Sequence, residues 1–154
     1  MDMGISVATE PVERADPREP LSVAPDFAVR DVLKLLKATD RGEVLVCRDG
    51  VLVGIFTERD ALRVLARHAD LDCPIERVMT PDPVTLGEGD ALKTAIVKMG
   101  ASGYRRLPIV DDRGRPTSLL SVAGIVHWIV EHFPQAVYNL PPVSKPVMYE
   151  REGP

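Results

Sequence analysis

Residues 20–23 read Pro-Leu-Ser-Val, and 63 positions later residues 83–86 read Pro-Val-Thr-Leu. The same offset aligns the apolar run at 44–46, Val-Leu-Val, with Leu-Pro-Ile at 107–109. Two separate matches at one offset indicate an internal repeat. We therefore expect two copies of one supersecondary unit.

The two copies differ in length at one turn. The turn of the first copy, Arg48–Gly50, is one residue shorter than that of the second copy, Asp111–Gly114, so Thr57 aligns with Ser121 at an offset of 64. Surface turns tolerate insertions far better than packed elements do. The position of the insertion therefore supports a duplicated fold.

Both copies have the same predicted order of elements. A short strand precedes a helix with apolar residues at helical spacing, and two strands joined by a glycine-containing turn lead into a second helix. The first copy has these elements at 21–23, 29–36, 44–47, 51–56 and 58–68, and the second at 84–86, 92–99, 107–110, 117–120 and 122–133. Pro134 ends the last helix. The order β-α-β-β-α, found twice, predicts an α/β fold.

Size and composition fit one or two small packed units. The chain has 154 residues, and 45% of them are hydrophobic, which suffices for a core. A net charge of -4 disfavours a general nucleic-acid binder. With no apolar run of about 18 residues and no signal-peptide pattern, we expect a cytosolic protein without membrane contact. Cys47 and Cys73 lie far apart, which argues against a disulfide framework or a zinc knuckle.

The two ends of the chain differ from the repeats. Residues 1–19 mix prolines with acidic residues, a composition that predicts a mobile arm. Residues 134–154 are also rich in proline but contain enough apolar residues to pack on another part of the protein or on a second subunit. The expected boundaries are thus an arm at 1–19, a first repeat at 20–78, a second repeat at 79–133 and an extension at 134–154.

One motif, Gly54-Ile55-Phe56-Thr57-Glu58-Arg59-Asp60, joins the last strand of the first repeat to its second helix. With Val78-Met79-Thr80 before the second repeat and the duplicated element order, it resembles the cystathionine-β-synthase (CBS) domain. The resemblance covers residues 20–133 and implies two CBS repeats related by a pseudo-twofold axis, together forming one Bateman module. It also implies a regulatory role and the binding of adenosine nucleotides, or of other adenosyl ligands, between the repeats.

Thr57 and Asp60 admit two interpretations. Thr-x-x-Asp at a helix start can be a capping box, in which each side chain bonds the backbone of the other residue. The same groups can also bind a ligand, because exposed N–H groups favour a phosphate and a carboxylate can accept both hydroxyls of a ribose. The duplicated setting favours the ligand interpretation, and the two roles are partly compatible.

The resemblance implies further residues at this nucleotide cleft. It places Pro83, Val84 and Thr85 opposite Thr57 and Asp60, with Tyr104, Arg105 and Arg106 entering from the second repeat. Two guanidinium groups near a helix N-terminus would clamp a phosphate, although Arg105 and Arg106 could instead be a solvated basic pair. Phe56 and Val84 could enclose the adenine, or both could belong to the core.

The mirror-related cleft has lost these groups. There, Thr57 is replaced by Ser121, Asp60 by Gly124 and Gly54 by Ser118. The positions of Arg106 and Arg105 hold Glu43 and Gly42. Gly124 cannot hold a ribose, and Glu43 would repel a phosphate by about 1–4 kcal/mol at 4 Å. The sequence therefore predicts one competent nucleotide site per chain.

Catalysis is not expected. The sequence has no nucleophile and base in a recognisable pattern, no P-loop and no HExxH motif, and the spacing of His127 and His132 does not suit a metal site. We therefore expect a stand-alone, non-catalytic sensor of AMP, ADP or ATP that regulates an unknown protein. The alternatives are a constitutive assembly module with vestigial clefts, a binder of S-adenosylmethionine, and an enzyme acting on the bound ligand. The apolar helix at 122–133 supports a homodimer.

Overall fold

The computed structural model describes residues 9–132, so the predicted C-terminal extension and the first eight residues of the predicted arm lie outside the described part. Within it, no helix is long and apolar enough to cross a membrane.

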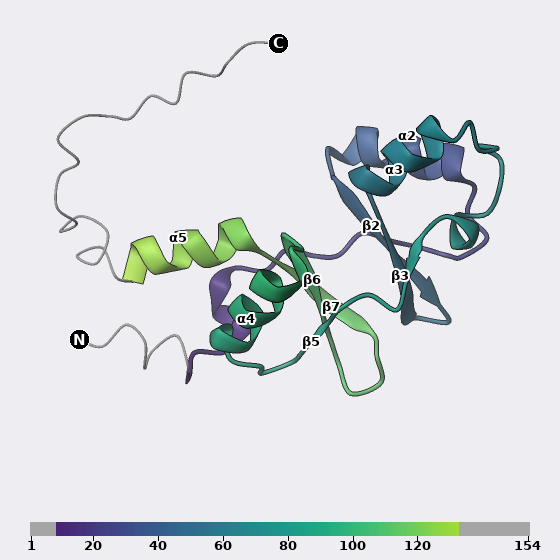
Figure 1. Ribbon diagram of the computed structural model, residues 1–154. Coiled ribbons are helices and arrows are strands. Elements are labelled where there is room, and N and C mark those ends of the chain that lie inside the picture. Colours follow the sequence, from purple (N-terminus) through teal and green to yellow (C-terminus); the bar gives the residue numbers. More distant parts are fainter. Residues whose placement is uncertain (1–8, 133–154) are drawn as a thin grey trace, which may run out of the picture.

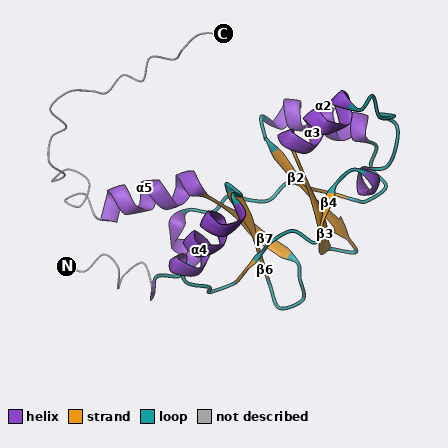
Figure 2. Cartoon of the chain, in the orientation of Figure 1, coloured by secondary structure: helices purple, strands orange, loops and turns teal. Residues whose placement is uncertain are grey.

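Each repeat has the predicted order of elements (Figures 1 and 2). The first repeat contains β1 (Ser22–Val23), α2 (Val29–Thr39), β2 (Glu43–Arg48), β3 (Val51–Thr57) and α3 (Glu58–Ala66). The second contains β5 (Leu86–Gly87), α4 (Leu92–Ser102), β6 (Arg106–Val110), β7 (Pro116–Ser121) and α5 (Val122–His132). A 3₁₀ turn precedes each repeat, η1 (Val12–Ala15) and η2 (Ile75–Arg77), and the short strand β4 (Thr80–Pro81) comes after η2. The β-α-β-β-α prediction is confirmed.

The strands form two small sheets, ordered β1-β2-β3-β4 and β5-β6-β7. Successive side chains of a strand point to opposite faces of its sheet. Along β3, Phe56 is therefore fully buried in the core that the sheet forms with α2 and α3. Ile55, on the other face, joins a small apolar cluster with Leu45 of β2 and with Leu119 of β7 in the second repeat. This cluster holds the two sheets together.

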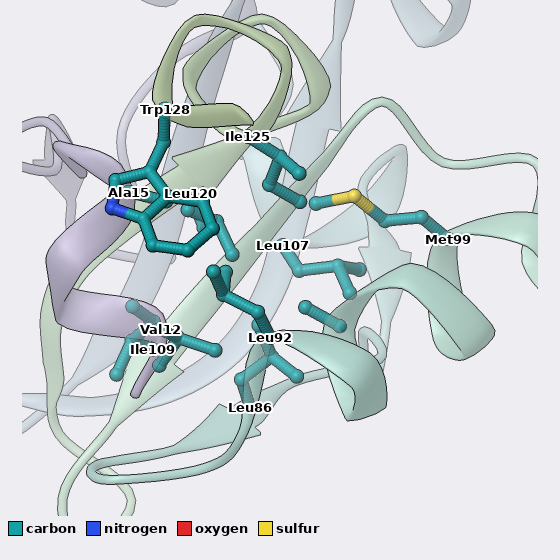
Figure 3. Packing of buried hydrophobic residues seen from close by; sticks show 11 residues of the cluster. Val12, Ala15, Leu86, Leu92, Met99, Leu107, Ile109, Leu120, Ile125 and Trp128 are labelled. Carbon is teal, nitrogen blue, oxygen red and sulfur yellow. The ribbon is translucent and has the colours of Figure 1, made fainter. Parts of the chain in front are cut away.

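Residues 9–19 are not a mobile arm, and that prediction is wrong for the described part of the segment. Val12 and Ala15 are fully buried in the core of the second repeat, beside Leu92 and Trp128 (Figure 3). Arg18 exchanges backbone hydrogen bonds of 2.9 and 2.8 Å with Leu119 of β7. Composition misled because two well-placed apolar residues and strand pairing are enough to order a short segment.

The segment between the repeats contacts the first repeat in the same way that the N-terminal segment contacts the second. The Val12 amide donates to the Asp90 carbonyl at 2.8 Å, and 63 positions later the Ile75 amide donates to the Phe27 carbonyl at 2.7 Å. Each 3₁₀ turn therefore packs on the repeat that it does not immediately precede. Such a reciprocal exchange is what a twofold relation between two units produces, and here the two units are the halves of one chain.

The sequence carries a signal for this arrangement. Pro11-Val12-Glu13-Arg14 matches Pro74-Ile75-Glu76-Arg77 at the offset of 63. The duplicated unit thus begins at Pro11, ahead of the boundary that we predict at residue 20.

Close packing of the N-terminal segment explains Gly124 in α5. A Cβ atom there would lie 2.6 Å from the Ala15 carbonyl oxygen. We expect Gly124→Ala to lower the free energy of unfolding by about 1–3 kcal/mol, because the backbone must move to relieve the overlap. Urea denaturation measures the change. Gly100→Ala in α4 is the matched control: nothing lies within 4 Å of its Cβ position, and alanine favours a helix. Equal destabilisation by both changes would contradict this explanation.

Candidate functional site

The junction between β3 and α3 is a capping box. The Thr57 hydroxyl accepts a 3.3 Å hydrogen bond from the Asp60 amide, and the Asp60 carboxylate accepts a 3.0 Å bond from the Thr57 amide and a 3.1 Å bond from the Thr57 hydroxyl. The capping interpretation of these residues is confirmed. It leaves the other carboxylate oxygen of Asp60 directed toward its neighbours outside the motif.

Those neighbours are Thr80 and Arg63. The Thr80 hydroxyl donates to Asp60 Oδ1 at 3.2 Å, and Arg63 Nη1 lies 3.7 Å from the same oxygen. Thr80 reaches Asp60 because β4 pairs with β3, which places Thr80 opposite Ile55. Asp60 is 5% exposed and is thus held between the first repeat and the segment leading into the second.

Thr80 is a further candidate, absent from the site residues that we predict because Met79-Thr80-Pro81 is most simply a linker leading into the next strand. The available signal was Val78-Met79-Thr80 itself, which carries part of the resemblance. Gly54 belongs to the same construction: a Cβ there would collide with the Met79 sulfur. The glycine lets the linker lie flat on β3 and brings Thr80 to the carboxylate.

Arg106 and Glu43 do not lie in separate clefts. Arg106 Nη1 is 3.1 Å from Glu43 Oε2, and the two side chains are 42% and 5% exposed. Glu43 pairs with Thr57 across β2 and β3, and Arg106 pairs with Ser121 across β6 and β7. The ion pair therefore lies between the starts of α3 and α5, and the negative charge of Glu43 is compensated by the arginine that was expected to clamp a phosphate.

The other predicted residues are only partly brought together. Phe56 is a fully buried core residue of the first repeat, which agrees with the second of the two roles considered for it. Val84 is partly buried against the core of the second repeat, and the Thr85 carbonyl accepts a 2.7 Å bond from Lys98. Pro83 is half-buried, and the side chains of Tyr104 and Arg105 are exposed. Within residues 9–132, no hydrogen bond joins any of these groups to Thr57 or Asp60.

At the mirror site, which consists of Ser121, Gly124 and Pro17, the hydrogen-bonding set is reduced. Ser121 keeps the cap and accepts a 2.9 Å bond from the Gly124 amide. Gly124 replaces the carboxylate of Asp60, and Pro17, at the position of Thr80, has no hydroxyl. The Ala15 carbonyl fills the space that a side chain at 124 would need. The first site has the Thr57 hydroxyl, the Asp60 carboxylate and the Thr80 hydroxyl, whereas the mirror site keeps only the hydroxyl of Ser121.

The model of the CBS domain family matches residues 12–67 and 75–131. The chain belongs to the CBS domain family. The fold class that we inferred from the duplicated order is thereby confirmed, and the first match begins at Val12, within the segment that packs on the second repeat.

Related CBS proteins extend the comparison. The CBS domain-containing protein YhcV of Bacillus subtilis is 35% identical over 91 residues, which cover 58% of this chain and 65% of YhcV, so the chain spans less than two thirds of that relative. A CBS domain protein of Pyrobaculum aerophilum, solved in complex with AMP, superposes with a TM-score of 0.68 at 26% identity, covering 74% of this chain and 88% of that one. A CBS domain pair solved with 5′-methylthioadenosine and S-adenosylmethionine gives 0.71 at 22% identity, covering 80% and 98%, and shows the shared fold.

Proposed function

We propose that this CBS domain pair is a regulatory module that binds an adenine nucleotide at one site per chain, around Thr57, Asp60 and Thr80. The observation that carries the proposal is the Asp60 carboxylate, which is buried and oriented by donors from Thr57 and Thr80. A carboxylate held in this way can accept ribose hydroxyls in place of the Thr80 hydroxyl. The AMP complex of the Pyrobaculum aerophilum protein supports the choice of ligand.

The proposed site can report ligand binding because its groups also connect the two halves. A ribose that takes up Asp60 competes with Thr80 for the carboxylate, and a phosphate that takes up Arg106 competes with Glu43. The first change weakens the contact of the first repeat with the linker, and the second weakens its contact with the second repeat. A ligand shifts the relative pose of the repeats when it binds the two poses with different affinity. The function needs no chemical step, and the chain acts on a partner that reads this pose.

The test is the number of nucleotides bound and the stability that they add. We expect calorimetric titration with AMP, ADP and ATP to give one site per chain. A ligand at 100 times its dissociation constant stabilises the folded state by about 2.7 kcal/mol, which raises the unfolding temperature by several degrees. S-adenosylmethionine is titrated in parallel as the alternative ligand. Two equivalent sites would contradict the one-site proposal, and no shift with any compound would contradict nucleotide binding.

The second candidate function is a constitutive assembly module, favoured by apolar side chains on the outer helices. Leu62 of α3 is 68% exposed and Val126 of α5 is 50% exposed, and the two occupy equivalent positions in the repeats. Paired exposed apolar positions suit a homodimer formed through helix faces. Sedimentation with and without AMP separates the two functions, because an assembly module forms the same dimer and takes up no ligand.

A further inference from the structure

A hollow of about 430 Å³ lies beside Asp60, between the side of α3 and the segment from Arg77 to Pro81. Arg63 of α3 and Arg67, which directly follows α3, line it one helical turn apart, and Arg77 lines it from η2. Arg63 reaches the Asp60 carboxylate at 3.7 Å, whereas Arg67 and Arg77 form no ion pair with any residue between 9 and 132. Three guanidinium groups thus share one cavity with a single carboxylate, in a chain whose net charge is -4.

The corresponding surface of the second repeat has different chemistry. His127 and Glu131 stand at the positions of Arg63 and Arg67, and Arg14, at the position of Arg77, is paired with Glu10 at 3.6 Å. Trp128 takes the place of Val64 and is buried in the core. The basic cavity is therefore a property of the half that keeps Asp60, and the duplicated fold alone does not create it.

We propose that this arginine cavity, lined by Arg63, Arg67 and Arg77, binds a chain of two or three phosphates. Guanidinium groups donate paired hydrogen bonds to phosphate oxygens. Several of them converging from two elements match an anion with several charged groups better than one carboxylate or one phosphate. The cavity adjoins Asp60 and Thr80, so the phosphate chain is either a free oligophosphate or the tail of a nucleotide whose ribose lies at Asp60. In the second case, which rests on the proposed function, the tail lies at these arginines instead of at Arg106. The arginine lining of the cavity carries the proposal, and it adds a phosphate-binding region to the nucleotide site proposed above.

The probes are inorganic tripolyphosphate, ATP and AMP, titrated calorimetrically at one fixed ionic strength. The test variant is Arg67→Ala/Arg77→Ala, which removes two exposed side chains and keeps Arg63 on Asp60. The matched control, Arg59→Ala/Arg113→Ala, removes the same charge from exposed positions outside the cavity. We expect tripolyphosphate to bind the test variant at least about 10-fold more weakly than the wild type, and the control within about twofold of it.

ATP and AMP identify the source of the phosphate chain. Weaker ATP binding with unchanged AMP binding supports a nucleotide tail in the cavity, and unchanged binding of both supports a free oligophosphate. Equal losses in the test and control variants would overturn the proposal in favour of diffuse attraction, and so would wild-type protein that does not bind tripolyphosphate. AMP binding to the wild type reports on the proposed function separately, so the two can fail independently.

Discussion

Val12→Asp is expected to lower the free energy of unfolding by about 3 kcal/mol or more, enough to unfold the second repeat of a marginally stable chain. Val12 is fully buried among Leu86, Leu92 and Ile109 (Figure 3), and a carboxylate there has no partner. Burying an unpaired charge is among the costliest single changes. The effect falls on residues 86–132 although the change lies outside them in sequence.

The measurement combines urea denaturation with hydrogen exchange resolved along the chain. Exchange should accelerate first in α4, β7 and α5, which the N-terminal segment contacts. Arg18→Asp introduces the same side chain at an exposed position of the same segment and should change stability by less than about 0.5 kcal/mol. Ile75→Asp is the symmetry-related change and should destabilise the first repeat. If Val12→Asp were as mild as Arg18→Asp, the segment would not be part of the core.

Asp60→Ala is expected to weaken nucleotide binding by about 100-fold or more, whereas Ser121→Ala at the mirror site should change it by less than about twofold. Hydrogen bonds to a charged group contribute about 1.5–3 kcal/mol each, and a ribose offers two hydroxyls to the carboxylate. Calorimetric titration with AMP measures both. Loss of binding in the Ser121 variant with binding kept in the Asp60 variant would reverse the assignment of the sites.

Stability must be controlled in this experiment, because Asp60 also caps α3. Loss of the cap costs about 1 kcal/mol, so circular dichroism and urea midpoints are needed for each variant. Asp60→Asn retains a carbonyl oxygen that can accept from the Thr57 amide, and it removes the charge. We expect this variant to keep most of the stability that the cap provides and to bind AMP more weakly than the wild type. Thr80→Ala separates the contribution of the linker hydroxyl from that of the carboxylate.

The regular part of the fold was readable from the sequence because its causes are local. Apolar spacing fixed the helices and the strands, and the fixed offset fixed their duplication. Thr57 and Asp60 could be placed at a helix start because a capping box is made by residues three positions apart. Composition failed for residues 9–19, since Val12 and Ala15 are ordered by a core formed elsewhere in the chain.

The parts of the site that escaped prediction depend on contacts between distant elements. Phe56 faces the helices and not the neighbouring repeat, a consequence of strand alternation that motif matching left open. Thr80 reaches Asp60 only through the pairing of β4 with β3. The Arg106–Glu43 contact could not be read from either repeat alone, since each side chain is supplied by a different half.

The Arg106–Glu43 contact also bears on how a duplicated chain comes to prefer its own two halves. The residues occupy one position in the two copies and touch each other, so they lie close to the axis that relates the halves. Had both copies kept the same residue, two glutamates or two arginines would face each other there and repel. Two first halves from separate molecules would meet glutamate to glutamate, and two second halves arginine to arginine. Divergence at this one position therefore favours pairing between a first half and a second half, and it disfavours pairing between two copies of the same half.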